Sequence, residues 1–322
     1  MLMKFSRTML TTAALTAAAV TAATSQASAT VAPAPLGHAH VAVHFDLAKG
    51  QTPENIALAP DGTAYVTFAA ARQVAQLTPG GTTRILATLP APADGGIHTP
   101  VVGFAMTSGI VRAHDGTLYF LYATGTSDLT GLWRLRPGGE PQRIAALPAT
   151  GLPNGLALDP CTHTLYITDS VLGAIWSVST TGGTPTTWST APQLASNGGF
   201  GANGLKIHNG ALWATNLDKG TILRIPVLPG GRAGTPQTRA TGLTGIDDIT
   251  FTGHSDRILA ALNGPSQVAL IQPDGTHSTV LSTADGLQNP TSIALRGDTA
   301  YVLSAAYLTA KDPNLVLAHL HN

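Results

Sequence analysis

Short apolar runs recur along the chain at intervals of 44 to 52 residues, each followed by a turn rich in Gly, Asn or Asp. The runs occupy residues 56–58, 104–106, 156–158, 205–207, 249–251 and 293–295. A second apolar strand follows each turn, and in the first five units a third and a fourth strand complete the pattern. Gly, Asn and Asp tolerate the backbone angles of tight hairpin turns. Each unit therefore reads as a four-stranded antiparallel sheet.

Six such units predict an all-β fold, a six-bladed β-propeller with four-stranded blades. The last unit ends after its third strand, near residues 315–318. Residues 41–46 precede the first unit and have no partner of their own. We expect them to form the outer strand of the last blade and so to close the ring. A β-sandwich is the alternative, but it does not require six matched units.

Composition and the N-terminal segment limit the partners and the cellular location that we expect for this domain. The 322 residues contain 17 basic and 17 acidic side chains, which argues against nucleic acid or an anionic membrane as a partner. Residues 1–29 have the basic start, weakly apolar middle and small-residue end of a secretory signal peptide. We therefore expect a secreted protein in which residues 30–322 form one propeller without a membrane span. Cys161 is the only cysteine, which excludes an intramolecular disulfide.

Oxygen-bearing side chains recur at one position of the predicted inner strands. Two places before the six apolar runs stand Glu54, Val102, Asn154, Asn203, Asp247 and Thr291. Inner strands surround the central channel, so Glu54, Asn154, Asn203 and Asp247 should converge there as metal ligands. Two carboxylates and two amides suit Ca²⁺, although another divalent cation remains an option. The competing explanation, that Asn and Asp simply begin strands after turns, does not account for Glu54.

The segments 53–55, 152–156, 201–205 and 245–248 resemble the gluconolactonase and senescence-marker-protein family of calcium-dependent six-bladed propellers, which is related to paraoxonases and diisopropyl-fluorophosphatase-like enzymes. The resemblance implies that Glu54, Asn203 and Asp247 hold the metal. It implies that Asn154 completes the metal shell or orients the substrate, and that Asp247 also acts as the catalytic general base. The chain departs from the family pattern at Asn55, at Asp248, which replaces the usual Gly, and at Val102, where paraoxonases have a His.

Further residues are expected around this site. We expect Asp169, Asn216 and Asn263, which end second strands, to lie near the metal and to hold its ligands in place, and we expect the same of Asp248. The alternatives are hydrogen bonds to the following loops and, for Asp248, burial in the blade. The substrate-binding wall is expected to include Asn154, His98, Phe200 and Leu287.

These expectations together predict a metal-dependent hydrolase that acts on a small-molecule lactone or related ester. Two alternatives remain at this stage. One is a non-catalytic propeller that binds a ligand or partner and uses Ca²⁺ structurally. The other is a lyase or condensing enzyme similar to the strictosidine-synthase-like propellers, which need not use calcium.

Overall fold

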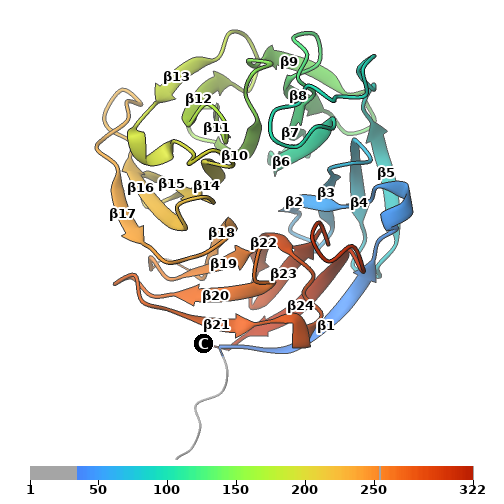
Figure 1. The fold of residues 1–322 in the computed structure, drawn as a ribbon, viewed down its shortest axis with the longest axis vertical. Coiled ribbons are helices and arrows are strands. Elements are labelled where there is room, and N and C mark those ends of the chain that lie inside the picture. The colour runs from blue at the N-terminus through green and yellow to red at the C-terminus, as the bar shows by residue number, and fades with distance from the viewer. Residues whose placement is uncertain (1–34, 254, 322) are drawn as a thin grey trace, which may run out of the picture. The chain divides into compact units, whose positions relative to one another are not determined.

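The computed structural model describes residues 35–253 and 255–321, and these residues form six four-stranded sheets. Figure 1 shows the sheets arranged radially around a central axis, so the predicted six-bladed propeller is confirmed. The predicted signal peptide, residues 1–29, lies outside the described residues. No helix within the described part of the chain is long and apolar enough to cross a membrane.

Each blade is an antiparallel meander whose first strand lies innermost. Blades one and two contain β2 (Pro53–Leu58), β3 (Ala64–Phe68), β4 (Gln73–Leu77), β5 (Thr83–Thr88), β6 (Met106–Arg112), β7 (Leu118–Ala123), β8 (Gly131–Leu135) and β9 (Gln142–Ala146). Blades three and four contain β10 (Pro153–Asp159), β11 (Thr164–Asp169), β12 (Ala174–Ser179), β13 (Thr186–Ser189), β14 (Ala202–His208), β15 (Ala211–Asn216), β16 (Thr221–Pro226) and β17 (Gln237–Ala240). Blades five and six contain β18 (Ile246–Phe251), β19 (Ile258–Leu262), β20 (Gln267–Ile271), β21 (His277–Leu281), β22 (Pro290–Arg296), β23 (Thr299–Ser304), β24 (Asn314–Leu320) and β1 (Leu36–His44).

The sixth blade is completed by the strand that precedes the first blade. β1 pairs antiparallel with β24, from Leu36 opposite Leu320 to His44 opposite Asn314. Figure 1 shows this pairing where the blue start of the described chain lies beside its red end. The closing strand is therefore as predicted, although it begins at Leu36 and not at residue 41.

Apolar side chains fill the space between neighbouring blades. Between blades one and six, for example, Val66 and Phe68 pack in one buried cluster with Leu303 and Leu315. A single sheet cannot bury both of its faces by itself, so each blade depends on its neighbours for a core. This mutual burial fixes the angle at which each inner strand faces the axis.

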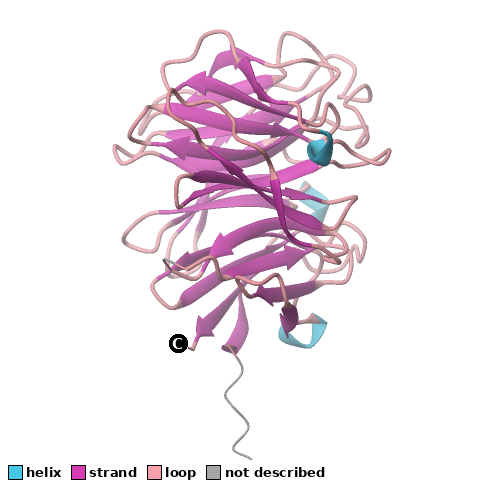
Figure 2. Ribbon diagram, turned by 90° about the vertical axis from the view of Figure 1, so that its left-hand side faces the viewer, coloured by secondary structure: helices cyan, strands magenta, loops and turns pink. Residues whose placement is uncertain are grey.

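The inner strands all begin at the same end of the propeller. Three short 3-10 helices of the described chain, Leu47–Lys49, Pro192–Leu194 and Thr283–Asp285, lie in connections that lead into inner strands. Figure 2 shows the helices on one side of the disc. We call this side, formed by the connections before the inner strands and after the second strands, the proximal face.

The second blade corrects one prediction. The apolar run at 104–106 is not its inner strand, because β6 spans Met106–Arg112. Ile110 lies opposite Phe120, just as Leu156 lies opposite Ile167 in the third blade. The position two places before the apolar run is therefore Ser108 in this blade, and Val102 lies in the preceding loop.

Candidate metal and active site

A β-bulge near the start of each inner strand determines where the side chains of the site point. The ladder between each inner strand and the next strand shifts register at this point in all six blades. Such bulges re-aim side chains, and they are common next to active sites. The bulges carry the ring positions Glu54, Ser108, Asn154, Asn203, Asp247 and Thr291. All six of these side chains are buried.

Four of the ring residues meet in one cavity. Glu54, Asn154, Asn203 and Asp247 all line a cavity of about 450 Å³ on the proximal face. The structure therefore brings together the four side chains that the sequence singled out as metal ligands. Thr291 does not line this cavity, because its hydroxyl donates to the backbone oxygen of Pro53 at 2.9 Å.

Threonines on the second strands hold neighbouring ring residues at a common height. The Gly204 N–H donates to Thr215 Oγ1 at 2.7 Å, and this hydroxyl donates to the backbone oxygen of Asp247 at 2.6 Å. Thr168 makes the equivalent pair of contacts one blade earlier, and Thr67 does so in the first blade. Each hydroxyl therefore joins two adjacent blades at the level of the site. Neither Thr168 nor Thr215 was predicted to support the site, although a Thr near the end of three second strands is a visible signal in the sequence.

The residue after each ring position determines how closely neighbouring inner strands approach. In blades two, three and four this residue is Gly, and a Cβ there would collide with the backbone of the next inner strand. The glycines are Gly109, Gly155 and Gly204. In blades five, six and one the same position carries Asp248, Ser292 and Asn55. In blades five, six and one, polar side chains therefore lie between neighbouring inner strands. In blades two, three and four, the backbones of these strands contact each other directly.

These polar side chains form a buried network around Asp248. Lys206 Nζ lies 2.7 Å from both carboxylate oxygens of Asp248. The Ser292 hydroxyl donates to the same carboxylate at 2.8 Å, and Asn55 Nδ2 donates to it at 3.3 Å. Asp248 is thus a cross-blade anchor neutralised by Lys206. It does not line the cavity beside Asp247, so the alternative of burial in the propeller is the one that the structure supports.

Tyr307 is a site residue that the sequence did not predict. It lies in the loop between β23 and β24, and its hydroxyl donates to Glu54 Oε2 at 2.6 Å. Burial raises the pKa of Glu54 to about 7, the hydrogen bond from Tyr307 opposes this rise, and the charge of Asp248 adds to it. Burial and the Glu54 carboxylate also raise the pKa of Tyr307, so the phenol remains a protonated donor.

Asp247 has the second strongly perturbed carboxyl group of the site. Burial raises its pKa well above the usual range, and the negative charges of Glu54 and Asp248 raise it further. Hydrogen bonding from Asn263, whose Nδ2 lies 3.4 Å from Asp247 Oδ2, and the positive charge of Lys206 act in the opposite direction. Two buried carboxyl groups whose charged forms are both disfavoured make a site that favours a cation.

The unused oxygens of this site fit a hard divalent cation. Asn203 Oδ1 is buried and has no hydrogen-bond partner. Asn154 Nδ2 donates to Ser170 Oγ at 3.2 Å, and this bond leaves the side-chain oxygen of Asn154 available. No group of three or more His, Cys, Asp or Glu side chains in the described residues has the arrangement of a metal site. A metal here would therefore depend on the mixed carboxylate and amide donors that Ca²⁺ accepts.

The predicted supporting residues have different roles in the structure. Asn263 lines the cavity and contacts Asp247. Asp169 accepts the backbone N–H groups of Leu152 and Leu172, each at 2.9 Å. Asn216 Nδ2 donates to the backbone oxygens of residues 193 and 195. Asp169 and Asn216 therefore shape loops of the proximal face and do not line the cavity.

The cavity walls are built mostly from apolar side chains. Phe200 is among them, as the sequence suggested, together with Val102, Phe104, Met106, Leu217 and Leu308. His98 does not line the cavity; its side chain is 74% exposed, with Nε2 3.9 Å from Asp94 Oδ2. Leu287 is buried in the core between blades five and six, so the expectation that it forms a wall is wrong.

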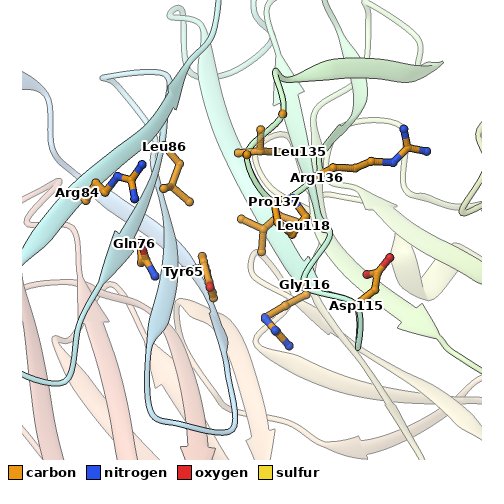
Figure 3. Close-up of a pocket in the computed structure, with 13 residues that line it drawn as sticks. Tyr65, Gln76, Arg84, Leu86, Asp115, Gly116, Leu118, Leu135, Arg136 and Pro137 are labelled. Atoms are coloured by element: carbon orange, nitrogen blue, oxygen red, sulfur yellow. The ribbon is translucent and has the colours of Figure 1, made fainter.

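A groove of about 470 Å³ between the first two blades has different chemistry (Figure 3). Tyr65, Gln76 and Arg84 line one side of it, and Leu118 and Leu135 line the other. Its one carboxylate, Asp115, is already bonded to the backbone and hydroxyl of Thr117. Size therefore does not distinguish the two cavities, whereas converging oxygen donors do.

Comparison with known proteins places the chain among propellers at the level of fold. No family model and no curated protein sequence matches it. Regucalcin from Agrobacterium tumefaciens, described as a calcium-binding protein, superposes with a TM-score of 0.62 at 17% identity, over 86% of this chain and 94% of that one. A gluconolactonase from Xanthomonas campestris has a TM-score of 0.61 at 13% identity, over 90% and 98% of the two chains. Virginiamycin B lyase from Staphylococcus aureus has a TM-score of 0.60 at 19% identity, over 85% and 82%.

These likenesses confirm the fold that the sequence resemblance implied. Solved gluconolactonase and regucalcin structures share the six-bladed architecture of this chain. At identities of 13 to 19% the likeness extends to fold alone, and function has to be argued from the site.

Proposed function

We propose that the protein is an exported, Ca²⁺-dependent hydrolase of a lactone or related ester. The observation that carries the proposal is the cavity in which Glu54, Asn154, Asn203 and Asp247 converge from four different inner strands. The unpartnered buried oxygen of Asn203 and the raised pKa values of both carboxyl groups support a cation at this point. The signal-like residues 1–29 support export. Fold likeness to a calcium-binding regucalcin and to a gluconolactonase agrees with the proposal.

Each site residue has a defined task in this mechanism. A bound Ca²⁺ supplies Lewis-acid polarisation of the substrate carbonyl. Glu54, Asn203 and Asp247 would hold the cation, and the Tyr307 hydroxyl fixes the carboxylate of Glu54. Asn154 orients the substrate or completes the metal shell. Asp247 would take a proton from the attacking water and so act as the general base.

The strictosidine-synthase-like lyase or condensing alternative need not use calcium, so it does not account for the oxygen donors that converge in the cavity. A lyase of the kind found among the structural neighbours is not favoured either. The solved virginiamycin B lyase is described as catalytically inactive when a histidine is replaced by alanine. None of the described residues that line the cavity of this chain is a histidine. The non-catalytic alternative makes a distinct prediction, because a structural cation would alter stability without any turnover.

The test is hydrolysis of a panel of lactones and aryl esters by the chain from Thr30 onward, with Ca²⁺ and after chelation. We expect turnover that requires the metal. Asp247→Asn should lower kcat/KM by about 10²-fold or more, because it removes the base. The matched control is Asp274→Asn, an exposed turn carboxylate of the same blade, which should leave the rate unchanged. Equal rates for the Asp247→Asn variant and the unaltered protein would overturn the mechanism.

A further inference from the structure

The cavity is divided between an oxygen-rich base and apolar walls. Glu54, Asn154, Asn203 and Asp247 supply the oxygens. The side chains around them are mainly hydrocarbon: Val102, Phe104, Met106, Phe200, Leu217 and Leu308. A reacting carbonyl at the base would therefore carry its substituent into an apolar environment.

The walls offer few polar partners to a substrate. Tyr307 and Asn263 are the polar side chains that line the cavity apart from the four ring residues. The Tyr307 hydroxyl already donates to Glu54, and Asn263 already donates to Asp247. The hydroxyl groups of a sugar lactone would lose water here without gaining equivalent hydrogen bonds, which is unfavourable.

The apolar walls are held in place by specific bonds. The Asp218 carboxylate accepts the backbone N–H groups of Gly199 and Phe200 at 3.0 and 3.1 Å, which fixes the loop that carries Phe200. The buried side chain of Asn289 accepts the N–H groups of Leu308 and Thr309 at 2.9 and 3.0 Å. The backbone that carries Phe200 and Leu308 is therefore held in place without a bound substrate.

We infer that the substrate carries an alkyl or aryl substituent that fills the space beside Phe104, Phe200 and Leu308, and that polyhydroxylated sugar lactones are poor substrates. This inference rests on the proposed hydrolase function and narrows it to a substrate class. Burial of the substituent against these side chains supplies binding energy, while the oxygen-bearing side chains at the base of the cavity act on the carbonyl group.

The first experiment compares γ-lactones with unbranched alkyl chains from methyl to hexyl and glucono-δ-lactone, using Ca²⁺-loaded protein. We expect kcat/KM to rise about fourfold per methylene until the space is filled. Glucono-δ-lactone should be slower than the shortest alkyl lactone. Rates that do not depend on chain length, or that are highest for the sugar lactone, would overturn the inference.

Variants locate the effect in the cavity walls. Phe200→Ser and Leu308→Ser should flatten the dependence on chain length, and Leu308 is 73% exposed, so its replacement should not impair folding. Leu228→Ser is the control, since Leu228 is also an exposed leucine but lies outside the cavity, in the turn after β16. An unchanged slope in both wall variants would contradict the inference.

A binding measurement separates this inference from the proposed activity. The corresponding alkyl γ-lactams are resistant to hydrolysis, and calorimetry gives their affinities directly. Affinity that rises with chain length supports the apolar cavity even if no lactone is turned over, in which case only the hydrolase proposal fails. Lactam affinity that is independent of chain length overturns the inference whatever the hydrolysis data show.

Discussion

Glu54 combines a buried carboxylate with a hydrogen bond from a residue 253 positions away. The sequence could identify Glu54, because an acidic residue at a repeated strand position has no simple structural explanation. It could not identify Tyr307, since nothing in the pattern of the loop between β23 and β24 shows where the loop folds. Contacts of this kind depend on tertiary structure and not on repeat position.

The raised pKa of Glu54 predicts how stability depends on pH. Its pKa rises from an ordinary 4.5 to about 7 on folding, so between these values the folded chain binds a proton that the unfolded chain has released. Stability of the cation-free protein must therefore fall as pH rises through this range, by on the order of 2–3 kcal/mol. Asp247 contributes in the same direction, because its pKa is also raised.

Thermal unfolding of the chelated protein between about pH 5 and pH 8 checks this prediction. We expect the melting temperature to fall with rising pH, and to fall less in Glu54→Gln or with saturating Ca²⁺. A melting temperature that rises over this pH range in the chelated protein would contradict the raised pKa of Glu54.

The threonine hydroxyls that join second strands to neighbouring inner strands are predicted to stabilise the folded protein. Thr215→Val keeps the shape of the side chain but removes the hydroxyl between the Gly204 N–H and the Asp247 carbonyl. Leaving these buried groups unpaired should cost about 1–3 kcal/mol of unfolding free energy. Chemical denaturation measures this loss.

Thr238→Val provides the matched control, because Thr238 is exposed on the outer strand β17 of the same blade. Its replacement should change stability by less than about 0.5 kcal/mol. Similar losses in the two variants would show that the Thr215 hydroxyl has no special role in the ring.

The second blade shows where pattern reading fails. The run at 104–106 is apolar enough to suggest an inner strand, but Phe104 and Ala105 precede β6 and only Met106 belongs to it; Phe104 and Met106 line the cavity. The true ring position is Ser108, followed by Gly109 and Ile110. This order of polar residue, Gly and aliphatic residue also occurs at 154–156 and 203–205, so a comparison by glycine position would have found the correct register.

The whole propeller was predictable because its repeats follow one another along the chain. The way it closes was predictable because the last repeat lacks one strand. Five complete units and one incomplete unit require an additional strand, and β1 supplies it beside β24. For Asp169 and Asn216 the structure shows the alternative, hydrogen bonds to loops: the former accepts the N–H of Leu172 and the latter accepts the N–H of Lys219, each in the loop that follows its strand. Strand position therefore indicated the face on which they lie, while the loops determined their partners.

The convergence of four blades on one cation is the central claim of this account. Calorimetric titration of Ca²⁺ into the chelator-stripped chain from Thr30 onward tests it most directly. We predict saturable binding at one site per chain, which Glu54→Gln abolishes. The substitution of the chain's only other glutamate, Glu140→Gln, should preserve binding because this side chain is exposed. Absence of binding to folded protein, or undiminished binding in Glu54→Gln, would contradict the claim.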